Sequence, residues 1–556
     1  SAMSFSTAYS ATLNERMRID SSGNVIIAAG TGTLQTATAG TSNVRFGVNA
    51  GNSIASGGNY NVLVGDEAGT AITTGDNNTF VGAFSGEVTA TTGDNTALGL
   101  SALRNNVGSY NTALGSLALR TSGNTTYNTA VGYKAGYLVT TGVNNTLIGG
   151  LAGDAITTGA ANTAVGMQAL TSNTTGAANV AIGGYQVGIT TAALSNNTTG
   201  GNNVAIGTGS LNNNTTASNN TAVGFQSLAT NTDGTKNVAI GKSALEGNTT
   251  ASGNTAVGYD ALTANTTGAG NTALGTSALD ANTTGVDNTA VGQNALGANT
   301  TGKGNAAFGV NSLLLNTTGS GNSAFGSFQS GVQYAPLRSN TTGGSNCAFG
   351  VGALLANTTA SNNSAFGVNA LAANTTGGEH TAVGKGALDS NTTGNYNNAF
   401  GVNALGTTTT GAHNIGLGRD ALSTSATATG QCTLGDANIS NLRCNDTSIS
   451  SLSDSRDKTN VIDSPYGLDF INTVRPVQFL WDTRDGNAKD GSTRIGFLAQ
   501  ELLAATDGNN AVLDLVLDDN PDKLEAKYGN LLPIAIQAIQ DLSAQVDALT
   551  ARIETL

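Results

Sequence analysis

The chain has 556 residues, of which 10% are charged and 5% aromatic, and its formal net charge is −13. This acidic balance disfavours nucleic acid as a partner, because phosphate binding requires clustered Lys and Arg. No run of 18 apolar residues occurs, so we expect no membrane insertion. Cys347, Cys432 and Cys444 are too scattered for a disulfide framework or a zinc site, and we expect no metal and no other cofactor.

The first 42 residues precede the repeats that fill most of the chain. Ser1-Ala2-Met3 resembles the remnant of a purification tag before a natural Ser4, so we expect a native N-terminal anchor to be missing. The stretch from Glu15 to Val25 favours a β-hairpin over the first coil, since a solenoid needs a cap. Residues 1–42 are therefore predicted to be a cap or attachment segment.

Residues 43–435 repeat a unit of 17 residues, which is clearest in NTAVGFQSLATNTDGTK at 220–236. A period this regular is typical of a solenoid, in which each unit buries its apolar side against its neighbours. Each unit has one apolar residue at its fourth position, such as Val223, and another near its ninth, such as Leu228. This apolar length is too short for a helix, and it predicts two short strands per unit.

Turn residues separate the predicted strands. Gly224 follows the first strand, as its equivalents do, and is expected to supply a positive φ or a close backbone approach. The string Asn-Thr-Thr-Gly, as at 265–268, predicts a turn, since Asn and Gly tolerate left-handed conformations. Stacked coils would align Asn, Thr and Gly into ladders. The region is thus predicted to be mainly β, a long β-solenoid or β-roll shaft; because a single thin coil buries little, we expect three chains to pack together.

Two units are seven residues longer than the others. The first carries Tyr185, and the second carries Phe328, Tyr334 and Arg338. Loops on a rigid scaffold often bind ligands, and Tyr with Arg suits stacking on sugars, so these are candidate receptor loops. The alternative is a passive insertion, because lengthening a loop costs little. His380 replaces the leading Asn of its unit and is interpreted as a variant turn residue.

The repeats resemble two known kinds of protein. Their NSVAIG-like pattern is similar to the head repeats of trimeric autotransporter adhesins. The form NTAVGxxAL is still more similar to repeats of phage tail-fibre proteins, and the stretch from Glu15 to Val25 also resembles a segment of phage fibres. The resemblance of the repeats covers residues 43–435 and implies a rod, but it indicates no particular ligand.

After a linker at 436–452, the composition changes at Ser453. Residues 453–556 hold 26 of the 57 charged side chains of the chain, which marks a domain boundary. Their last part, at about 528–556, has apolar residues in steps of three and four, which predicts a heptad helix. The heptad residues are Leu532, Ala535, Ile539, Leu542, Val546, Leu549, Ile553 and Leu556. Three of the four a positions are β-branched, a pattern that favours a coiled coil of two helices.

Residues 453–556 resemble the intramolecular chaperone domain of the peptidase S74 type, which ends phage tail fibres, tailspikes and endosialidases. The motifs are SDSRDKTNV (453–461), YGLDFINTVRPVQFLW (466–481), GFLAQEL (496–502) and YGNLLPIAIQAIQDL (528–542). The resemblance implies a small α+β domain that assists trimerisation of the β-structure before it. It also implies self-cleavage immediately before the Ser of the Ser-Asp pair, between Leu452 and Ser453.

The residues around this site allow the chemistry to be considered separately. A Ser hydroxyl needs a base to become a nucleophile, and no His follows His413, so a Ser-His-Asp triad within this segment is excluded. Lys458 is the nearest base, if burial or a cation such as Arg456 lowers its pKa. A Ser and a Lys five residues apart are by themselves more typical of a solvated loop. The family motif places nucleophile and base at Ser453 and Lys458, with Asp454 orienting the pair or bending the scissile bond.

Taken together, the resemblances imply a phage tail fibre, located in the virion tail and extracellular at the host surface. Its expected partners are two further copies, other tail proteins at the N-terminus and a host receptor, either a saccharide or an outer-membrane component. Its one enzymatic activity would be the self-cleavage. A bacterial trimeric adhesin is one alternative, but it would need a membrane anchor where the charged segment stands. A tailspike depolymerase is another, but no carboxylate pair recurs in the shaft.

Overall fold

The computed structural model contains two compact units, Ser1–Asn305 and Ala306–Leu556. The residues that it describes are 3–8, 13–19, 25–27, 39–186, 191–326, 334–436, 438–439, 454–480, 491–518, 521–522 and 524–555. The first unit opens with three antiparallel strands, β1 (Met3–Ala8), β2 (Leu13–Ile19) and β3 (Val25–Ile27). The predicted hairpin is therefore part of a three-stranded sheet, and its capping role stays a prediction.

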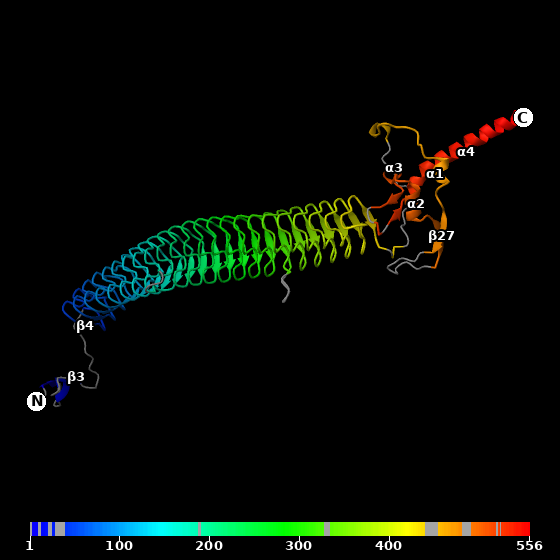
Figure 1. The fold of residues 1–556 in the computed structure, drawn as a ribbon. Helices are drawn as coiled ribbons and strands as arrows, with labels where there is room; N and C mark the ends of the chain where they lie inside the picture. Colours follow the sequence, from blue (N-terminus) through cyan, green and yellow to red (C-terminus); the bar gives the residue numbers. More distant parts are fainter. Residues whose placement is uncertain are drawn as a thin grey trace. The chain divides into compact units, whose positions relative to one another are not determined.

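The repeats of the first unit build a parallel β-solenoid (Figure 1). Each described coil contributes one strand of three residues, which pairs in register with the strand of the next coil. The strands are β4 (Val44–Phe46), β5 (Val62–Val64), β6 (Thr79–Val81), β7 (Thr96–Leu98), β8 (Thr112–Leu114), β9 (Thr129–Val131), β10 (Thr146–Ile148), β11 (Thr163–Val165), β12 (Val180–Ile182), β13 (Val204–Ile206), β14 (Thr221–Val223), β15 (Val238–Ile240), β16 (Thr255–Val257), β17 (Thr272–Leu274) and β18 (Thr289–Val291).

The second unit holds coils of the same kind, and their strands are again parallel and in register. These strands are β19 (Ala306–Phe308), β20 (Ser323–Phe325), β21 (Cys347–Phe349), β22 (Ser364–Phe366), β23 (Thr381–Val383), β24 (Asn398–Phe400), β25 (Ile415–Leu417) and β26 (Cys432–Leu434). The predicted β-solenoid is confirmed in both units.

The prediction of two strands per coil is wrong. In the coil 220–236 the strand covers the second to fourth positions, and Leu228 at the ninth position lies in a turn with a φ of 53°. Gln226 and Lys236 are left-handed too, with φ of 54° and 59°. Residues in this conformation cannot continue a strand. Everything after the strand is therefore a succession of turns.

The interior of a coil is narrow, and small residues decide what fits inside. Ala222 at the third position and Leu228 at the ninth are fully buried. In the coil at 78–94 the ninth position is Gly, and a larger side chain takes the space: Phe80 is fully buried, and a Cβ on Gly86 would lie 2.3 Å from its ring. The core of this coil is thus close-packed by exchange of volume between its third and ninth positions.

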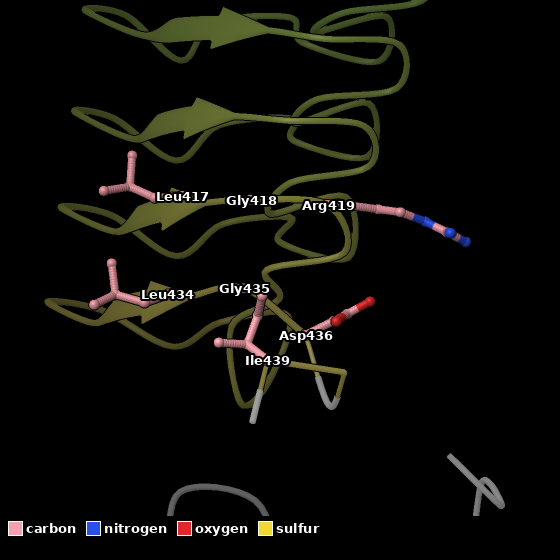
Figure 2. A pocket seen from close by; sticks show the side chains of 7 residues that line it. All are labelled: Leu417, Gly418, Arg419, Leu434, Gly435, Asp436 and Ile439. Carbon is pink, nitrogen blue, oxygen red and sulfur yellow. The ribbon is translucent and has the colours of Figure 1, made fainter. Parts of the chain in front are cut away.

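The fourth-position side chains point outward and form an apolar row along each unit, which we call the fourth-position row. Figure 2 shows the last two coils, where Leu417 and Leu434 project from their strands. Arg419 and Asp436 follow the fifth-position glycines and lie on the other side of them. The exposed members of the row are Phe46, Leu98, Ile148, Ile182, Ile206, Ile240, Leu274, Phe349, Phe366, Val383, Phe400, Leu417 and Leu434.

Buried asparagines stack into two ladders, which confirms that prediction. At the first position, Asn237 donates its backbone N–H to Oδ1 of Asn220 at 3.0 Å, and the Asn220 amide donates to the Gly234 carbonyl at 2.9 Å. At the twelfth position, the Asn231 amide donates to Oδ1 of Asn214 at 3.0 Å. All these side chains are fully buried. Their hydrogen bonds offset the cost of burying amides.

The fifth-position glycines meet both predicted requirements. Gly149 has a φ of 135°, and a Cβ there would lie 2.5 Å from the Gly166 carbonyl oxygen. The Asn-Thr-Thr-Gly string forms a bend as predicted, but for another reason, because neither Asn265 nor Gly268 is left-handed. A Cβ on Gly268 would lie 2.2 Å from the Gly285 carbonyl oxygen, so this glycine is required by close stacking.

Two neighbouring glycines provide a test of this stacking. Gly149→Ala is expected to destabilise the first unit by about 2–4 kcal/mol, because Ala strains the positive φ and its methyl meets backbone. Gly150→Ala is the matched control, since a Cβ there has no atom within 4 Å, and it should change stability by less than about 0.5 kcal/mol. Chemical unfolding followed by circular dichroism measures both. Equal stability of the two variants would contradict the close approach of the coils.

His380 takes the leading ladder position of its coil and is 1% exposed. Its Nδ1 accepts the Asn397 backbone N–H at 3.1 Å, as Oδ1 of Asn does in other coils. Burial lowers the pKa of His380 to about 4, although backbone hydrogen bonds with Gly394 and Asn397 act in the opposite direction. His380 is thus a buried ladder residue and not the turn residue that the sequence predicted.

This histidine predicts acid sensitivity of the second unit. Its pKa is 6.5 when unfolded and about 4 when folded, so between these values the unfolded chain binds more protons. Stability should be full above pH 6.5, fall as the pH drops towards 4 and then level off, with a total loss of roughly 3 kcal/mol from this group. His380→Asn should remove that loss. Urea unfolding at pH 7 and pH 4.5 tests it: an equal pH dependence of both proteins would contradict the prediction.

The C-terminal part of the second unit is a small α+β domain, as predicted. Its elements are the 3₁₀ turn η1 (Ser455–Asp457), α1 (Leu468–Ile471), β27 (Val477–Leu480), β28 (Thr493–Gly496), α2 (Ala499–Ala505), α3 (Asn510–Leu513), β29 (Val516–Leu517), β30 (Glu525–Ala526), η2 (Tyr528–Asn530) and α4 (Leu531–Glu554). Both strand pairs are antiparallel. The predicted final helix is confirmed. The core consists of Leu502, Leu513, Leu515, Val516, Leu531 and Ile534.

Candidate self-cleavage and assembly site

The predicted scissile bond lies outside the described residues, because these begin again at residue 454. The cleavage between Leu452 and Ser453 therefore stays a prediction. The residues directly after it are described, and they form the turn η1. Asp454 caps this turn at its start, and Lys458 follows at its end, so one short turn carries both predicted partners of Ser453.

Asp454 is held by Arg456. The Asp454 carboxylate accepts the Arg456 backbone N–H at 2.9 Å and its Nε–H at 3.0 Å. The Arg456 guanidinium and its N–H lower the pKa of Asp454, which keeps this carboxylate ionised. The sequence suggested Arg456 as a cation that acts on Lys458, but its guanidinium pairs with Asp454.

Lys458 is exposed in the single chain, and its backbone N–H donates to the Ser455 carbonyl at 3.3 Å. A lysine becomes a general base when burial or a neighbouring cation lowers its pKa. Lys458 follows the predicted nucleophile by five residues in the sequence. A further element must therefore cover Lys458 before this lysine can act as the general base.

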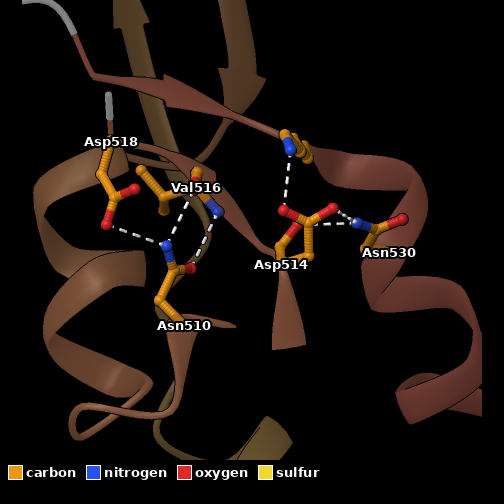
Figure 3. A network of polar contacts seen from close by, with 6 residues as sticks. Asn510, Asp514, Val516, Asp518 and Asn530 are labelled. Atoms are coloured by element: carbon orange, nitrogen blue, oxygen red, sulfur yellow. Dashed lines mark hydrogen bonds and ion pairs between the residues drawn. The ribbon is translucent and has the colours of Figure 1, made fainter. Parts of the chain in front are cut away.

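A polar network fixes the start of α4 (Figure 3). The Asp514 carboxylate accepts Lys527 Nζ at 2.7 Å, and the Asn530 amide donates to the Asp514 carbonyl at 2.6 Å. On the other side, the Asn510 amide donates to the Val516 carbonyl at 2.9 Å. These contacts join α3, β29 and η2, so the first turn of α4 has a defined position in the domain.

One face of α4 packs against its own domain. Leu531, Ile534 and Ala538 are buried there. Further along, the Asp541 carboxylate accepts the Leu468 backbone N–H at 3.0 Å, which ties α4 to α1. The Gln537 amide and this N–H lower the pKa of Asp541. The helix is thus anchored by a face that does not include the predicted heptad residues.

The heptad residues of α4 are exposed, and we call them the heptad seam. Leu532 is 64% exposed and Ile553 is 63% exposed, although both are large and apolar. The other strongly exposed members are Ile539, Leu542, Val546 and Leu549. Ala535 is half-buried, and Leu556 lies outside the described residues. A contiguous apolar stripe of this kind on a helix marks an interaction surface.

The C-terminal segment also has a match among known families. Residues 453–513 match the Peptidase S74 family, described as the chaperone of endosialidase. Over these residues the chain is similar to the endosialidase chaperone, and a solenoid of 17-residue repeats precedes them. No curated protein and no solved structure is significantly similar to the chain.

The candidate receptor residues are only partly described. Tyr185 is 41% exposed, and its N–H donates to the Met167 carbonyl at 3.0 Å, so it stacks on the preceding coil. Tyr334 is 37% exposed, Arg338 is half-buried, and Phe328 lies outside the described residues. Receptor binding by these side chains stays a prediction. Within the described ranges, no group of His, Cys, Asp and Glu is suited to hold a metal, and no helix is long and apolar enough to span a membrane.

One feature of the first unit was not predicted from the sequence. Arg104, Arg120 and Tyr137 each take the tenth position of successive coils, and cations lie over aromatic rings there. This column is visible in the sequence only when the units are aligned in register.

Proposed function

We propose that this protein is a phage tail fibre whose C-terminal domain joins three chains and then releases itself by cutting before Ser453. The solenoid and the match of residues 453–513 to the endosialidase chaperone support a tail fibre or tail spike. A protein with this role stands in the virion tail, meets the host surface and joins other tail proteins at its N-terminus. The observation that carries the proposal is the exposed heptad seam.

The heptad seam gives the C-terminal domain a means of joining chains. Its large apolar side chains from Leu532 to Ile553 are 49–68% exposed along α4, while another face of the helix packs on the domain. Burying each such side chain contributes about 1.5–3 kcal/mol. Three copies of the helix would cover the seam as a coiled coil. The β-branched a positions favour a coiled coil of two helices. In this proposal the domain and the shaft together set the number of chains at three instead.

The fourth-position row gives the coils a second surface for the same partners. In the second unit its Phe rings stack from coil to coil, with centroids of Phe325 and Phe349 4.5 Å apart. A row of half-exposed apolar side chains on a regular sheet face suits packing against an identical row. Nucleation at the C-terminus would then bring the coils of the three chains together, which shortens the slow search for non-local contacts.

The chaperone and the cleavage are coupled in this proposal. Lys458 is exposed in the single chain, and a lysine needs cover to act as a base. Assembly of three domains supplies that cover next to η1. Cutting after assembly leaves a shaft that is trapped kinetically, because the domain that guided it has left.

Sedimentation equilibrium of the freshly purified protein tests the proposal. The expected result at micromolar concentration is a species with three times the mass of one chain, or three times the mass of residues 1–452 where the chains have been cut. A monomer would overturn the proposed assembly. A dimer would show that the heptad pattern alone sets the number of chains.

A further inference from the structure

The first unit carries a cation–aromatic surface on the coils at 78–144. We define this surface as Phe84, Arg104, Arg120, Tyr133, Lys134 and Tyr137. Its tenth-position members are stacked, because Asn105 N–H donates to the Arg120 carbonyl at 3.0 Å and Thr121 N–H donates to the Tyr137 carbonyl at 3.2 Å. The surface is therefore built on consecutive rungs of a rigid ladder.

Contacts between these side chains hold the cations in place. The Arg104 guanidinium lies 5.1 Å from the centre of the Phe84 ring and pairs with Glu87. Arg120 donates to the Tyr137 hydroxyl at 2.8 Å. Lys134 Nζ lies 5.3 Å from the Tyr133 ring centre and 5.4 Å from that of Tyr137. Cations held over rings in this way are ordered before any ligand arrives.

The charge of this surface is only partly neutralised. Residues 43–305 contain seven Lys and Arg, and three of them stand here on consecutive coils. Arg104 has Glu87 as its partner, but in the described part of the chain no carboxylate pairs with Arg120 or Lys134. At the tenth position of the following coil, the Asp154 carboxylate accepts a hydrogen bond from the Thr171 hydroxyl at 2.6 Å. A local positive site thus stands on a chain of net charge −13.

We infer that this surface binds an acidic polysaccharide, which would be the receptor contact of the proposed fibre. Arg120 and Lys134 can each donate charge-assisted hydrogen bonds to a carboxylate. Tyr133 is 52% exposed and offers a ring face to a sugar. Single-stranded nucleic acid fits less well, because it needs several open stacking rings and a longer cationic track.

The surface is separate from the proposed contact between chains. Each strand that carries a member of the fourth-position row is followed by a glycine. Gly132 is one of these, and its φ of 132° turns the chain away from the strand. Tyr133 and Lys134 follow this glycine in the sequence. Chains that pack through the fourth-position row leave this surface open. The inference rests on the proposed function, since a host-surface saccharide is the partner that such a fibre would meet.

Binding of polygalacturonate to the purified protein, compared with binding of its methyl ester, tests the inference. We expect binding of the acid form that weakens with salt, and little binding of the uncharged ester. Arg120→Ala combined with Lys134→Ala should weaken binding at least about tenfold. Lys236→Ala combined with Lys242→Ala is the control; it removes the same charge and also a cation over a ring, that of Tyr259, and should not change binding.

Four outcomes would overturn the inference: no binding of the acid form, equal binding of the ester, unchanged binding in the first double variant, or tighter binding of oligothymidylate. Sedimentation of the same samples separates this failure from failure of the proposed function. Trimers that do not bind polygalacturonate would contradict the saccharide site alone. A wild-type monomer would contradict the proposed assembly, whatever it binds.

Discussion

Ser453→Ala is expected to leave the chain at its full length, whereas the wild-type protein separates into residues 1–452 and 453–556. The Ser453 oxygen would attack the Leu452 carbonyl, the C–N bond would break, and the freed amine would take a proton. Water would then hydrolyse the ester that joins Leu452 to the serine. Denaturing mass spectrometry of freshly purified protein distinguishes the two masses. The expected effect is a complete loss of cleavage.

Two further substitutions separate the roles in this reaction. Ser455→Ala is the matched control, since Ser455 is exposed in the same turn and should not affect cleavage. Lys458→Arg keeps the positive charge but removes the base, because a guanidinium does not lose its proton in proteins. It should therefore be as inactive as Ser453→Ala. Cleavage of Lys458→Arg at the wild-type rate would exclude Lys458 as the base, and an intact wild-type chain would exclude the whole assignment.

The repeat shows how far sequence reasoning reaches into this fold. The period and the ladders follow from a residue such as Asn220 recurring every 17 positions, because equal residues must stack when coils are equal. The number of strands did not follow. Leu228 is left-handed and buried, and leucine seldom adopts that conformation, so its type predicted a strand.

The apolar character of the strand residues also did not predict which of their side chains point into the coil. Val223 is the larger residue of the strand and Ala222 the smaller, yet Ala222 is inside. The reason is volume: Leu228 from the turn fills the narrow interior, and only a methyl group fits beside it. Where Gly86 leaves room, Phe80 enters at the equivalent of Ala222. This dependence of one position on another appears only when the coil is closed.

The C-terminal site shows a different limit. The family pattern placed Asp454 and Lys458 at the two ends of what proves to be one turn. The pairing of Arg456 with Asp454 depends on the path of that turn, which spacing does not give. The heptad seam was evident from spacing alone, but its exposure required the structure, because α4 buries Ile534 and Ala538 on a neighbouring face.

Charges placed in the heptad seam are expected to convert the proposed trimer into monomers. Val546 and Leu549 are 52% and 56% exposed in the single chain and would be buried between helices. Val546→Asp combined with Leu549→Asp removes about 1.5–3 kcal/mol of apolar burial per side chain. It also places a carboxylate in an apolar contact, which costs several kcal/mol more. In a trimer this loss occurs three times, so sedimentation equilibrium should show monomers at micromolar concentration.

The control is Ala544→Asp combined with Ala551→Asp, which adds the same charge to exposed positions of α4 away from the seam. This variant should stay trimeric. Because cover for Lys458 comes from assembly in our proposal, the seam variant should also remain uncut, while the control is cut as in the wild type. Monomers that still cut themselves would separate cleavage from assembly. A trimeric seam variant would instead move the contact between chains from α4 to the fourth-position row.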